Sequence, residues 1–305
     1  MRAQLLGVPT ALGIPRVASQ EGPAALRRLG LVSALQDILE VTDLGDMPVL
    51  RRNVGDRVGR LLHKVVVQAH RQASAFADAY TADSLPITIG GDHTASLGTA
   101  LALTQLGLSF DVVWLDAHAD FHTPKTSPSG NPHNMVLAIL AGLTPYLHQT
   151  VAPYRLHLWG VRDLDSWERS VLEALGVEVR DVRGTRAELP ALMGSLGQNV
   201  FVSFDCDCCQ PAVAPGTLTP VPDGFERAEV LRIVQQLSEN RRVLALDVAE
   251  LHPDRDREDQ TANLARDVIL TVARGQARRQ RETPSTRRLR VTNGEATPTS
   301  RSFCA

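Results

Sequence analysis

Three short apolar runs in this chain end in side chains that are costly to bury. The runs at 85–89, 111–115 and 199–204 are typical of buried strands. They are followed by three polar motifs: Gly90-Gly91-Asp92-His93, Asp116-Ala117-His118-Ala119-Asp120 and Asp205-Cys206-Asp207. Carboxylates and imidazoles at strand ends cost free energy unless something compensates them. Together these motifs predict a site for a cation, and their number favours two cations.

The ligand atoms that these motifs offer are oxygen and nitrogen. Such a mixed set suits Mn²⁺ or a similar divalent ion better than a cysteine-rich structural zinc site. The cysteines are Cys206, Cys208, Cys209 and Cys304. Three of them lie within four residues, too close to link distant parts of a fold by disulfides. A thiolate metal site is one interpretation, but no second cysteine cluster completes a ligand set, so small buried apolar residues are favoured.

Strand-like and helix-like segments alternate along most of the chain. Strands are predicted at 4–8, 38–44, 85–89, 111–115, 155–160, 177–182, 199–204 and 242–248, and helices at 23–36, 56–79, 94–106, 134–141, 166–175, 187–196, 226–238 and 259–273. Near-continuous apolar strands separated by helices indicate a parallel sheet covered on both faces. We therefore expect an α/β fold, a single doubly wound domain with about eight parallel strands and helices on both faces. In such sheets ligands bind beyond the carboxyl ends of the strands, where the polar motifs lie.

The composition changes near the end of the chain. Residues 276–305 hold seven Arg, two Glu and almost no apolar side chain, which predicts a flexible arginine-rich tail after a catalytic domain at 1–275. A tail that contacts another subunit is the alternative. The formal net charge of −2 favours neither nucleic acid nor a membrane surface as a partner. No long apolar segment or secretory leader is recognised, so a cytoplasmic protein is expected.

Strand alternation also predicts how the acidic side chains point. It places Asp205 and Asp207 on one face, and Asp116, His118 and Asp120 on one side if the backbone stays extended. Two divalent ions about 3.5–4 Å apart, bridged by carboxylates, lower the pKa of a water held between them. The resulting hydroxide can attack an electrophilic carbon or phosphorus. The alternative, a solvated acidic patch, fits poorly with the strand-end positions.

The polar motifs belong to a longer ordered set. The set comprises residues 90–98, the motif at 116–120, residues 203–207 with 214–217, and Asp247-Val248-Ala249-Glu250-Leu251-His252-Pro253. In this order the motifs resemble the ureohydrolase superfamily of arginases, agmatinases and formimidoylglutamases. Gly7-Val8-Pro9 and Glu21-Gly22-Pro23 are also similar to the family, so the resemblance spans residues 1–275. It implies an arginase-like fold, two Mn²⁺ ions (with Co²⁺ or Fe²⁺ as alternatives) and a homotrimer or homohexamer.

The resemblance also implies a role for each metal-site residue. One metal would be held by His93, Asp116, Asp120 and Asp205, and its partner by Asp116, His118, Asp205 and Asp207. Hydroxide would attack a guanidinium carbon, and Asp120 would pass a proton to the leaving nitrogen. Glu250 would pair with the guanidinium, because a carboxylate can accept a fork of donors. A helix cap or a surface carboxylate is the alternative for Glu250.

The loop at 123–133 resembles that of arginases rather than agmatinases. The resemblance implies that Ser129 and Asn131 hold the α-carboxylate of an amino acid. It implies that His133 is a proton-shuttling imidazole at the mouth of the site. An ordinary loop histidine is the alternative for His133.

A second segment bears on the substrate. Arg162-Asp163-Leu164-Asp165 is similar to the arginase segment that holds the α-amino group, which implies a role for Asp165, with Asp163 nearby. A helix N-cap is the alternative for Asp165. Thr219 is also expected among the substrate-binding residues.

Three positions depart from the arginase pattern. His122 stands where arginases generally have Asn, facing the substrate carboxylate. Gln210 replaces an acidic residue near the metals, and Asn134 replaces the Gly after His133. These changes bear on the substrate more than on the type of reaction.

The leading hypothesis is a dimanganese arginase that hydrolyses L-arginine to L-ornithine and urea, far faster than it hydrolyses agmatine. The first alternative is a hydrolase of another guanidino compound, such as a modified arginine, a guanidino acid or agmatine. A second alternative is a catalytically silent ureohydrolase-like protein that binds a ligand or a partner enzyme. A relative of the deacetylases, which generally use one zinc, fits the paired motifs less well.

Overall fold

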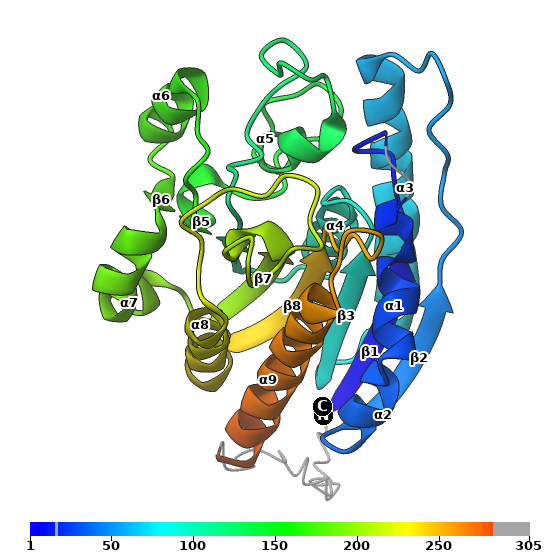
Figure 1. The fold of residues 1–305 in the computed structure, drawn as a ribbon, viewed down its shortest axis with the longest axis vertical. Helices are drawn as coiled ribbons and strands as arrows, with labels where there is room; N and C mark the ends of the chain where they lie inside the picture. Colours follow the sequence, from blue (N-terminus) through cyan, green and yellow to red (C-terminus); the bar gives the residue numbers. More distant parts are fainter. Residues whose placement is uncertain (16–17, 283–305) are drawn as a thin grey trace, which may run out of the picture.

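The computed structural model describes residues 1–15 and 18–282 (Figure 1). Its strands are β1 (Arg2–Val8), β2 (Glu40–Asp46), β3 (Ser84–Gly90), β4 (Asp111–Leu115), β5 (Leu156–Trp159), β6 (Glu178–Arg180), β7 (Asn199–Asp205) and β8 (Arg242–Ala249). They form one eight-stranded sheet in the order β2-β1-β3-β8-β7-β4-β5-β6. Every neighbouring pair is parallel.

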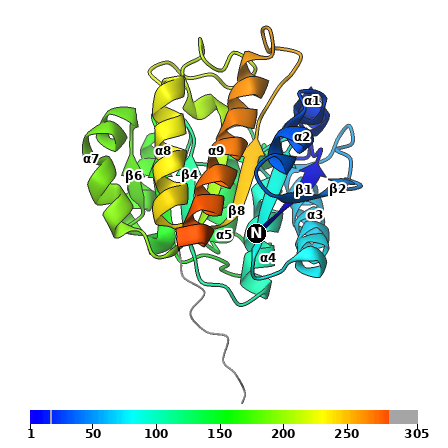
Figure 2. The same ribbon diagram turned by 90° about the horizontal axis from the view of Figure 1, so that it is seen from below.

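Helices cover both faces of this sheet. They are α1 (Gly22–Arg28), α2 (Leu31–Gln36), α3 (Val58–Ala79), α4 (Ala95–Gln105), α5 (Val136–Leu140), α6 (Ser166–Ala174), α7 (Val182–Ser195), α8 (Arg227–Asn240) and α9 (Gln260–Glu282). The apolar core on one face is shared by α1, α2, α7, α8 and α9, and that on the other face by α3, α4, α5 and α6 (Figures 1 and 2). The predicted α/β fold, with about eight parallel strands between two helical layers, is confirmed.

Four central strands bring the polar motifs to one edge of the sheet. The neighbours β3, β8, β7 and β4 are in a register that aligns four buried apolar residues: Ile89, Val248, Phe204 and Leu115. The residues that follow these four are Gly90, Ala249, Asp205 and Asp116. Because parallel strands all end at the same edge, the side chains that follow them converge there.

The helix predicted at 23–36 is divided in two. Gly30 separates α1 from α2 and has a φ of +74°. This left-handed conformation is common where a helix ends, and glycine adopts it without the steric cost that a Cβ brings. The pattern of apolar residues on both sides of Gly30 is helical, but the backbone leaves the helical conformation at Leu29 and Gly30.

The C-terminal segment is helical further than predicted. Helix α9 includes residues 276–282 of the predicted tail. The side chain of Gln276 accepts a hydrogen bond from the Val243 N–H (3.2 Å) and donates to the carbonyls of Ser238 (2.6 Å) and Arg241 (2.8 Å). These bonds tie the end of α9 to α8 and β8. Residues 283–305 lie outside the described residues, and for them the flexible tail stays a prediction.

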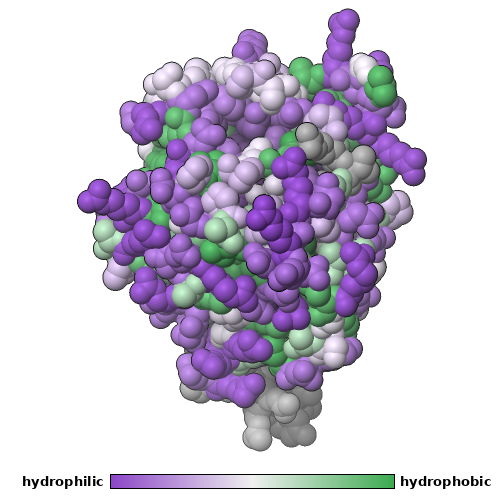
Figure 3. Space-filling model, in the orientation of Figure 1, coloured by the Kyte–Doolittle hydropathy of each residue, from purple (hydrophilic) through white to green (hydrophobic). Residues whose placement is uncertain are grey.

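The molecular face shown in Figure 3 is mainly polar, with apolar side chains in small groups between polar ones. Among the described residues, the exposed large apolar side chains are Leu44, Val54, Leu143 and Tyr154. No helix in the described part of the chain is long and apolar enough to cross a membrane. The expected oligomer and the expected absence of a nucleic-acid partner stay predictions.

Candidate metal centre

Two of the acidic side chains come directly from strand ends. β7 ends with Asp205, and Asp116 follows β4. After Asp205 the chain turns into the 3₁₀ helix Cys206–Cys208, in which the Asp205 carboxylate accepts from the Asp207 N–H at 2.8 Å. The strand alternation predicted for Asp205 and Asp207 is therefore wrong, because the strand has already ended. The tight turn brings both carboxylates to the site instead.

The imidazole of His93 lies among three carboxylates. Its Nδ1 is close to an oxygen of each: 3.1 Å from Asp116, 3.2 Å from Asp120 and 3.2 Å from Asp205. The ring stacks on Trp114 of β4, with centroids 3.9 Å apart and planes 13° apart. Its Nε2 lies 2.9 Å from the hydroxyl of Ser203 on β7. Stacking and the hydrogen bond at Nε2 hold Nδ1 toward the carboxylates, as outer contacts of metal-binding histidines do.

A second group surrounds His118. Its Nδ1 lies 3.2 Å from Asp207 Oδ2 and 3.4 Å from Asp116 Oδ1. Asp116 therefore contacts one imidazole with each of its oxygens, the arrangement expected of a bridging carboxylate. The predicted substrate residue Thr219 donates to Asp207 Oδ2 at 3.0 Å. The predicted Asp163 lies 3.6 Å from His118 Nε2.

The site residues fit a pair of divalent cations. The two groups that could each hold an ion are His93, Asp116 and Asp120, and Asp116, His118 and Asp207. Within the described residues, His93 Nδ1 and Asp116 Oδ2 are buried and lie 3.1 Å apart, but neither makes a hydrogen bond of acceptable geometry. Buried polar atoms are seldom left unpaired, so these two point to a ligand. Carboxylate oxygens and imidazole nitrogens without a thiolate suit Mn²⁺ and similar ions.

Burial and charge shift the pKa values of these groups strongly. Burial lowers the pKa of His93, but the surrounding carboxylates outweigh burial and hold that pKa well above its usual value. Burial, reinforced by the charge of Asp207, raises the pKa of Asp205 well above its usual range. Burial also raises the pKa of Asp120 to about 6. Since protons and metal ions compete for the same atoms, metal affinity should fall as the pH falls.

Glu250 and His133 lie beside the metal ligands. Glu250 Oε1 accepts from the His93 N–H at 3.1 Å and lies 3.4 Å from His133 Nδ1. Its Oε2 lies 3.1 Å from His252 Nε2. Burial raises the pKa of Glu250, but contacts with the two imidazoles outweigh burial and hold that pKa well below its usual range. Glu250 is therefore a buried carboxylate beside the metal groups.

Two residues of the centre have a strained backbone. Asp120 has a φ of +48° and Glu250 a φ of +57°. A left-handed conformation costs a residue with a Cβ about 1–2 kcal/mol. Such strain often occurs at functional sites, where the surrounding structure holds it.

The loop predicted to hold a substrate carboxylate is fixed by its own polar contacts. Ser129 Oγ accepts from the Asn131 N–H and from Asn134 Nδ2, both at 3.2 Å. Asn131 Oδ1 accepts from Arg52 Nη1 at 3.1 Å. Arg52 was not among the predicted site residues.

His122 lies against an acidic pair. Its Nε2 is 3.5 Å from Asp165 Oδ2 and 3.4 Å from Glu168 Oε2. Its ring is stacked on Trp167, with centroids 5.8 Å apart and planes 12° apart. Asp165 also caps α6, accepting from the Glu168 N–H at 2.8 Å, which confirms the helix-cap interpretation. One imidazole nitrogen thus already occupies the space between two carboxylates, and these three residues form a third group that could hold a cation.

Burial makes both His122 and Glu168 less charged than their residue types suggest. It lowers the pKa of His122, and the nearby Asp165 opposes this only in part. Burial also raises the pKa of Glu168 to about 7. Near neutral pH the imidazole is therefore mainly neutral, and its contacts with Asp165 and Glu168 are not ion pairs.

The cysteines beside the centre are apolar neighbours of the ligands. Cys206, Cys208 and Cys209 are buried and free. Burial raises the pKa values of Cys206 and Cys208 well above the usual range, so they are thiols rather than thiolate ligands. The nearby Gln210 accepts from the Gly224 N–H at 3.2 Å and brings no charge to the centre.

Three residues at the site were missed by the sequence analysis. Glu168 follows Asp165 at the spacing of a capping box, a signal that could have revealed it. His252 lies within the quoted motif at 247–253, two residues after Glu250. Arg52 belongs to no motif, and no pattern in the sequence links it to Asn131, 79 residues away.

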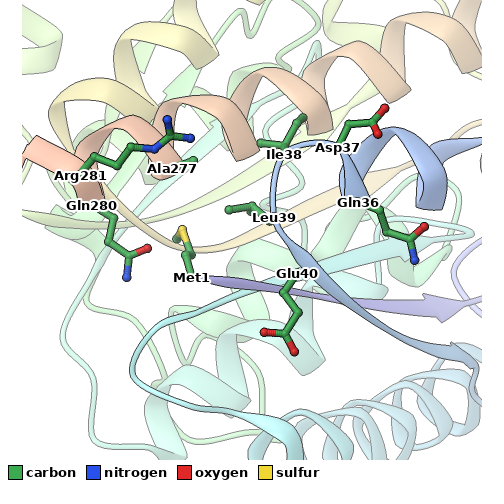
Figure 4. A pocket seen from close by; sticks show the side chains of 9 residues that line it. All are labelled: Met1, Gln36, Asp37, Ile38, Leu39, Glu40, Ala277, Gln280 and Arg281. Atoms are coloured by element: carbon green, nitrogen blue, oxygen red, sulfur yellow. The ribbon is translucent and has the colours of Figure 1, made fainter.

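A separate pocket lies at the opposite edge of the sheet. It has a volume of about 420 Å³ and is lined by residues that include Met1, Glu40 and Arg281 (Figure 4). Met1 and Glu40 stand at the amino ends of β1 and β2. The metal centre lies at the carboxyl ends, so this pocket is not part of it.

Comparison with known proteins gives the relatives of this chain. The arginase family model matches residues 1–274. The arginase of Agrobacterium fabrum is 32% identical over 290 residues, covering 88% of this chain and 90% of that protein. The hepatic arginase of Aquarana catesbeiana is 30% identical over 291 residues, covering 88% of this chain and 90% of that protein. The native structure of arginase from Bacillus caldovelox has a TM-score of 0.81 at 28% identity, covering 89% of this chain and 97% of that one.

Proposed function

The chain belongs to the arginase family, and from that premise we propose that it hydrolyses L-arginine to L-ornithine and urea with two divalent metal ions. The single observation that carries the proposal is the pair of ligand groups around His93 and His118, joined by Asp116. Mn²⁺ is the metal we propose first, because the ligands are oxygen and nitrogen atoms. At about 30% identity the curated relatives support the reaction class more firmly than the substrate.

The metal ions, when bound by the six ligand residues, would supply a water of lowered pKa that can add to a carbon at neutral pH. Glu250 orients the substrate, because its buried carboxylate can accept the forked donors of a guanidinium. Addition of water to the guanidinium carbon, followed by cleavage of the bond to the chain nitrogen, gives urea and an amine. The amine must gain one proton as it leaves.

Two residues are suited to move that proton. Asp120 lies among His93 and the other ligand carboxylates, where its carboxylate can accept a proton from the attacking water and pass it to the leaving nitrogen. The side chain of His133 is 16% exposed and lies 3.4 Å from Glu250. It can therefore exchange protons with solvent at the mouth of the site.

The amino-acid end of the substrate would lie over the loops. Ser129 and Asn131 offer hydrogen bonds to a carboxylate, and Asp165 offers an acceptor to an α-ammonium. Thr219 contacts Asp207, and Asp163 contacts His118, so these two residues would affect the substrate by positioning the metal ligands that they contact. A homotrimer or homohexamer is part of the proposal, and light scattering coupled to size-exclusion chromatography would measure it.

A second candidate function is hydrolysis of a guanidino acid without an α-ammonium. The observation that favours it is His122, whose Nε2 lies between Asp165 and Glu168. An imidazole in that place takes up acceptors that an ammonium would need. The reaction at the guanidinium end is the same for both candidates.

Urea release from a panel of guanidino compounds tests the proposal. The panel contains L-arginine, 5-guanidinopentanoate (which lacks the α-ammonium) and agmatine (which lacks the carboxylate), each measured with metal-free protein and after addition of Mn²⁺. We expect metal-dependent urea from L-arginine and much less from agmatine. Agmatine turnover that equals or exceeds L-arginine turnover would overturn the arginase assignment, and no urea from any compound would overturn the hydrolase.

A further inference from the structure

Arg52 is a cation at the edge of the candidate site that no predicted role explains. It lies in the segment between β2 and α3, and its side chain is partly buried. Nη1 donates to Asn131 Oδ1 at 3.1 Å and approaches the Leu12 carbonyl at 3.5 Å. Both acceptors are neutral. The guanidinium is therefore held in place by groups that do not neutralise it.

No carboxylate pairs with Arg52 within residues 1–15 and 18–282. The acids whose charges act on it are Asp92 and Asp56. Asp92 accepts from the backbone N–H groups of Gly13 and Thr94, and Asp56 is paired with Lys64. A partly buried cation without a counter-ion is costly. Arg52 is thus prepared to accept an anion.

The position of Arg52 relates this anion to the reaction. The Leu12 carbonyl belongs to the segment that packs on His133, since the Gly13 carbonyl accepts from the His133 N–H at 3.4 Å. A Cβ at Gly13 would lie 2.8 Å from the Cβ of His133, so this contact allows no larger residue. His133 in turn lies 3.4 Å from Glu250. A path of contacts therefore leads from Glu250, beside the metals, to Arg52 at the outer rim.

We propose that Arg52, together with Asn131, holds the carboxylate of a guanidino acid substrate and is the residue that distinguishes such acids from guanidino amines. This rests on the proposed function, because it identifies the outer end of the same site. Arg52 Nε and Nη2 make no hydrogen bond within the described residues. These two donors form the fork that matches a carboxylate. Because Asn131 Oδ1 accepts from Arg52, the amide nitrogen of Asn131 is left to donate.

The experiment compares two substrates in three variants of the full, Mn²⁺-loaded protein. Arg52→Leu removes the charge, Arg52→Lys keeps it without the fork, and Arg51→Leu is the control, an exposed neighbour on the same segment. For L-arginine we expect Arg52→Leu to lower kcat/KM by about 10- to 100-fold, mostly through KM, as for the loss of a charged hydrogen bond. The kcat/KM for agmatine should change by less than about twofold in Arg52→Leu, because agmatine has no carboxylate for Arg52 to bind. Arg52→Lys should recover part of the loss.

Two results would overturn the assignment. One is an equal loss for both substrates in Arg52→Leu, which would show that Arg52 only fastens the loop at Asn131. The other is no loss for L-arginine. Calorimetric measurement of L-arginine and agmatine binding to the same variants tests the role of Arg52 independently of whether the protein releases urea. If the protein releases no urea, selective loss of L-arginine binding in Arg52→Leu still supports the assignment, and unchanged binding or no binding refutes it.

Discussion

Replacing His122 with asparagine should strengthen recognition of an α-ammonium. In the present structure His122 Nε2 lies 3.5 Å from Asp165 and 3.4 Å from Glu168. Asparagine is shorter and removes the ring, so both carboxylates become available to a substrate ammonium. The unmodified protein should therefore prefer L-arginine over 5-guanidinopentanoate only weakly, by less than about tenfold.

The size of the expected change in substrate preference follows from the contacts that the His122 imidazole now makes with Asp165 and Glu168. A hydrogen bond to a charged group contributes about 1.5–3 kcal/mol. Freeing one such bond for the substrate should raise the preference for L-arginine by about 10- to 150-fold in His122→Asn. The variant also loses the ring stacking on Trp167, which costs about 0.5–1.5 kcal/mol of folding stability. A lower Tm is therefore expected alongside the gain in selectivity.

The assay is steady-state urea release from both compounds under Mn²⁺ saturation. His70→Asn, at an exposed position on α3, is the matched control and should leave the ratio unchanged. If His122→Asn changes kcat/KM for both compounds by the same factor, the imidazole does not block an ammonium site. The reasoning from the acidic pair would then be refuted.

Other perturbations test the metals, the core and the tail. Asp205→Ala should remove nearly all activity and lower the metal content below two ions per chain; a fully active protein with one ion would contradict this. In the metal-free protein, burial raises the pKa of Asp247 from 3.8 to about 7. Between pH 3.8 and 7, Asp247 therefore keeps its proton in the folded state but has lost it in the unfolded state. Asp247 should therefore lower the free energy of unfolding as pH rises from 4 to 7, by at most about 1.4 kcal/mol per pH unit, and Asp247→Asn should reduce the slope measured in denaturant titrations by that contribution. Truncation after Glu282 should leave urea release unchanged, whereas truncation after Gly275 should lower Tm because it removes the Gln276 bonds; equal Tm values would contradict this.

The parallel sheet was predictable because its central strands are buried on both faces. A strand in that position is apolar at most of its residues, as β4 and β8 are. The helix break at Gly30 was not predicted, because periodic apolar residues continue on both sides of it. The extent of α9 was underestimated for a different reason. Gln276 looks like a tail residue in the sequence, but three backbone groups bond its side chain in the fold.

The ligand residues were predictable in identity but not in geometry. Asp116 and Asp205 adjoin strand ends, so the strands alone bring them together. Asp120 reaches the site because its own backbone is left-handed, and Asp207 because it lies in a 3₁₀ turn. Strand alternation applies to neither. Local backbone conformation of this kind is set by tertiary contacts that a motif does not contain.

The reacting end and the outer end of the site are built from different kinds of element, which explains why the reaction is easier to predict than the substrate. The ligands Asp116 and Asp205 are fixed by the register of central strands. Arg52, Asn131 and His122 stand on loops outside the sheet, where a substitution does not move the strand ends. Variants at these loop positions should therefore change substrate ratios while keeping two metal ions, whereas variants at the strand ends should lose metal and all substrates together. Measuring metal content and the L-arginine to agmatine ratio across one set of variants would reveal this division, and loop variants that lose metal in proportion to selectivity would disprove it.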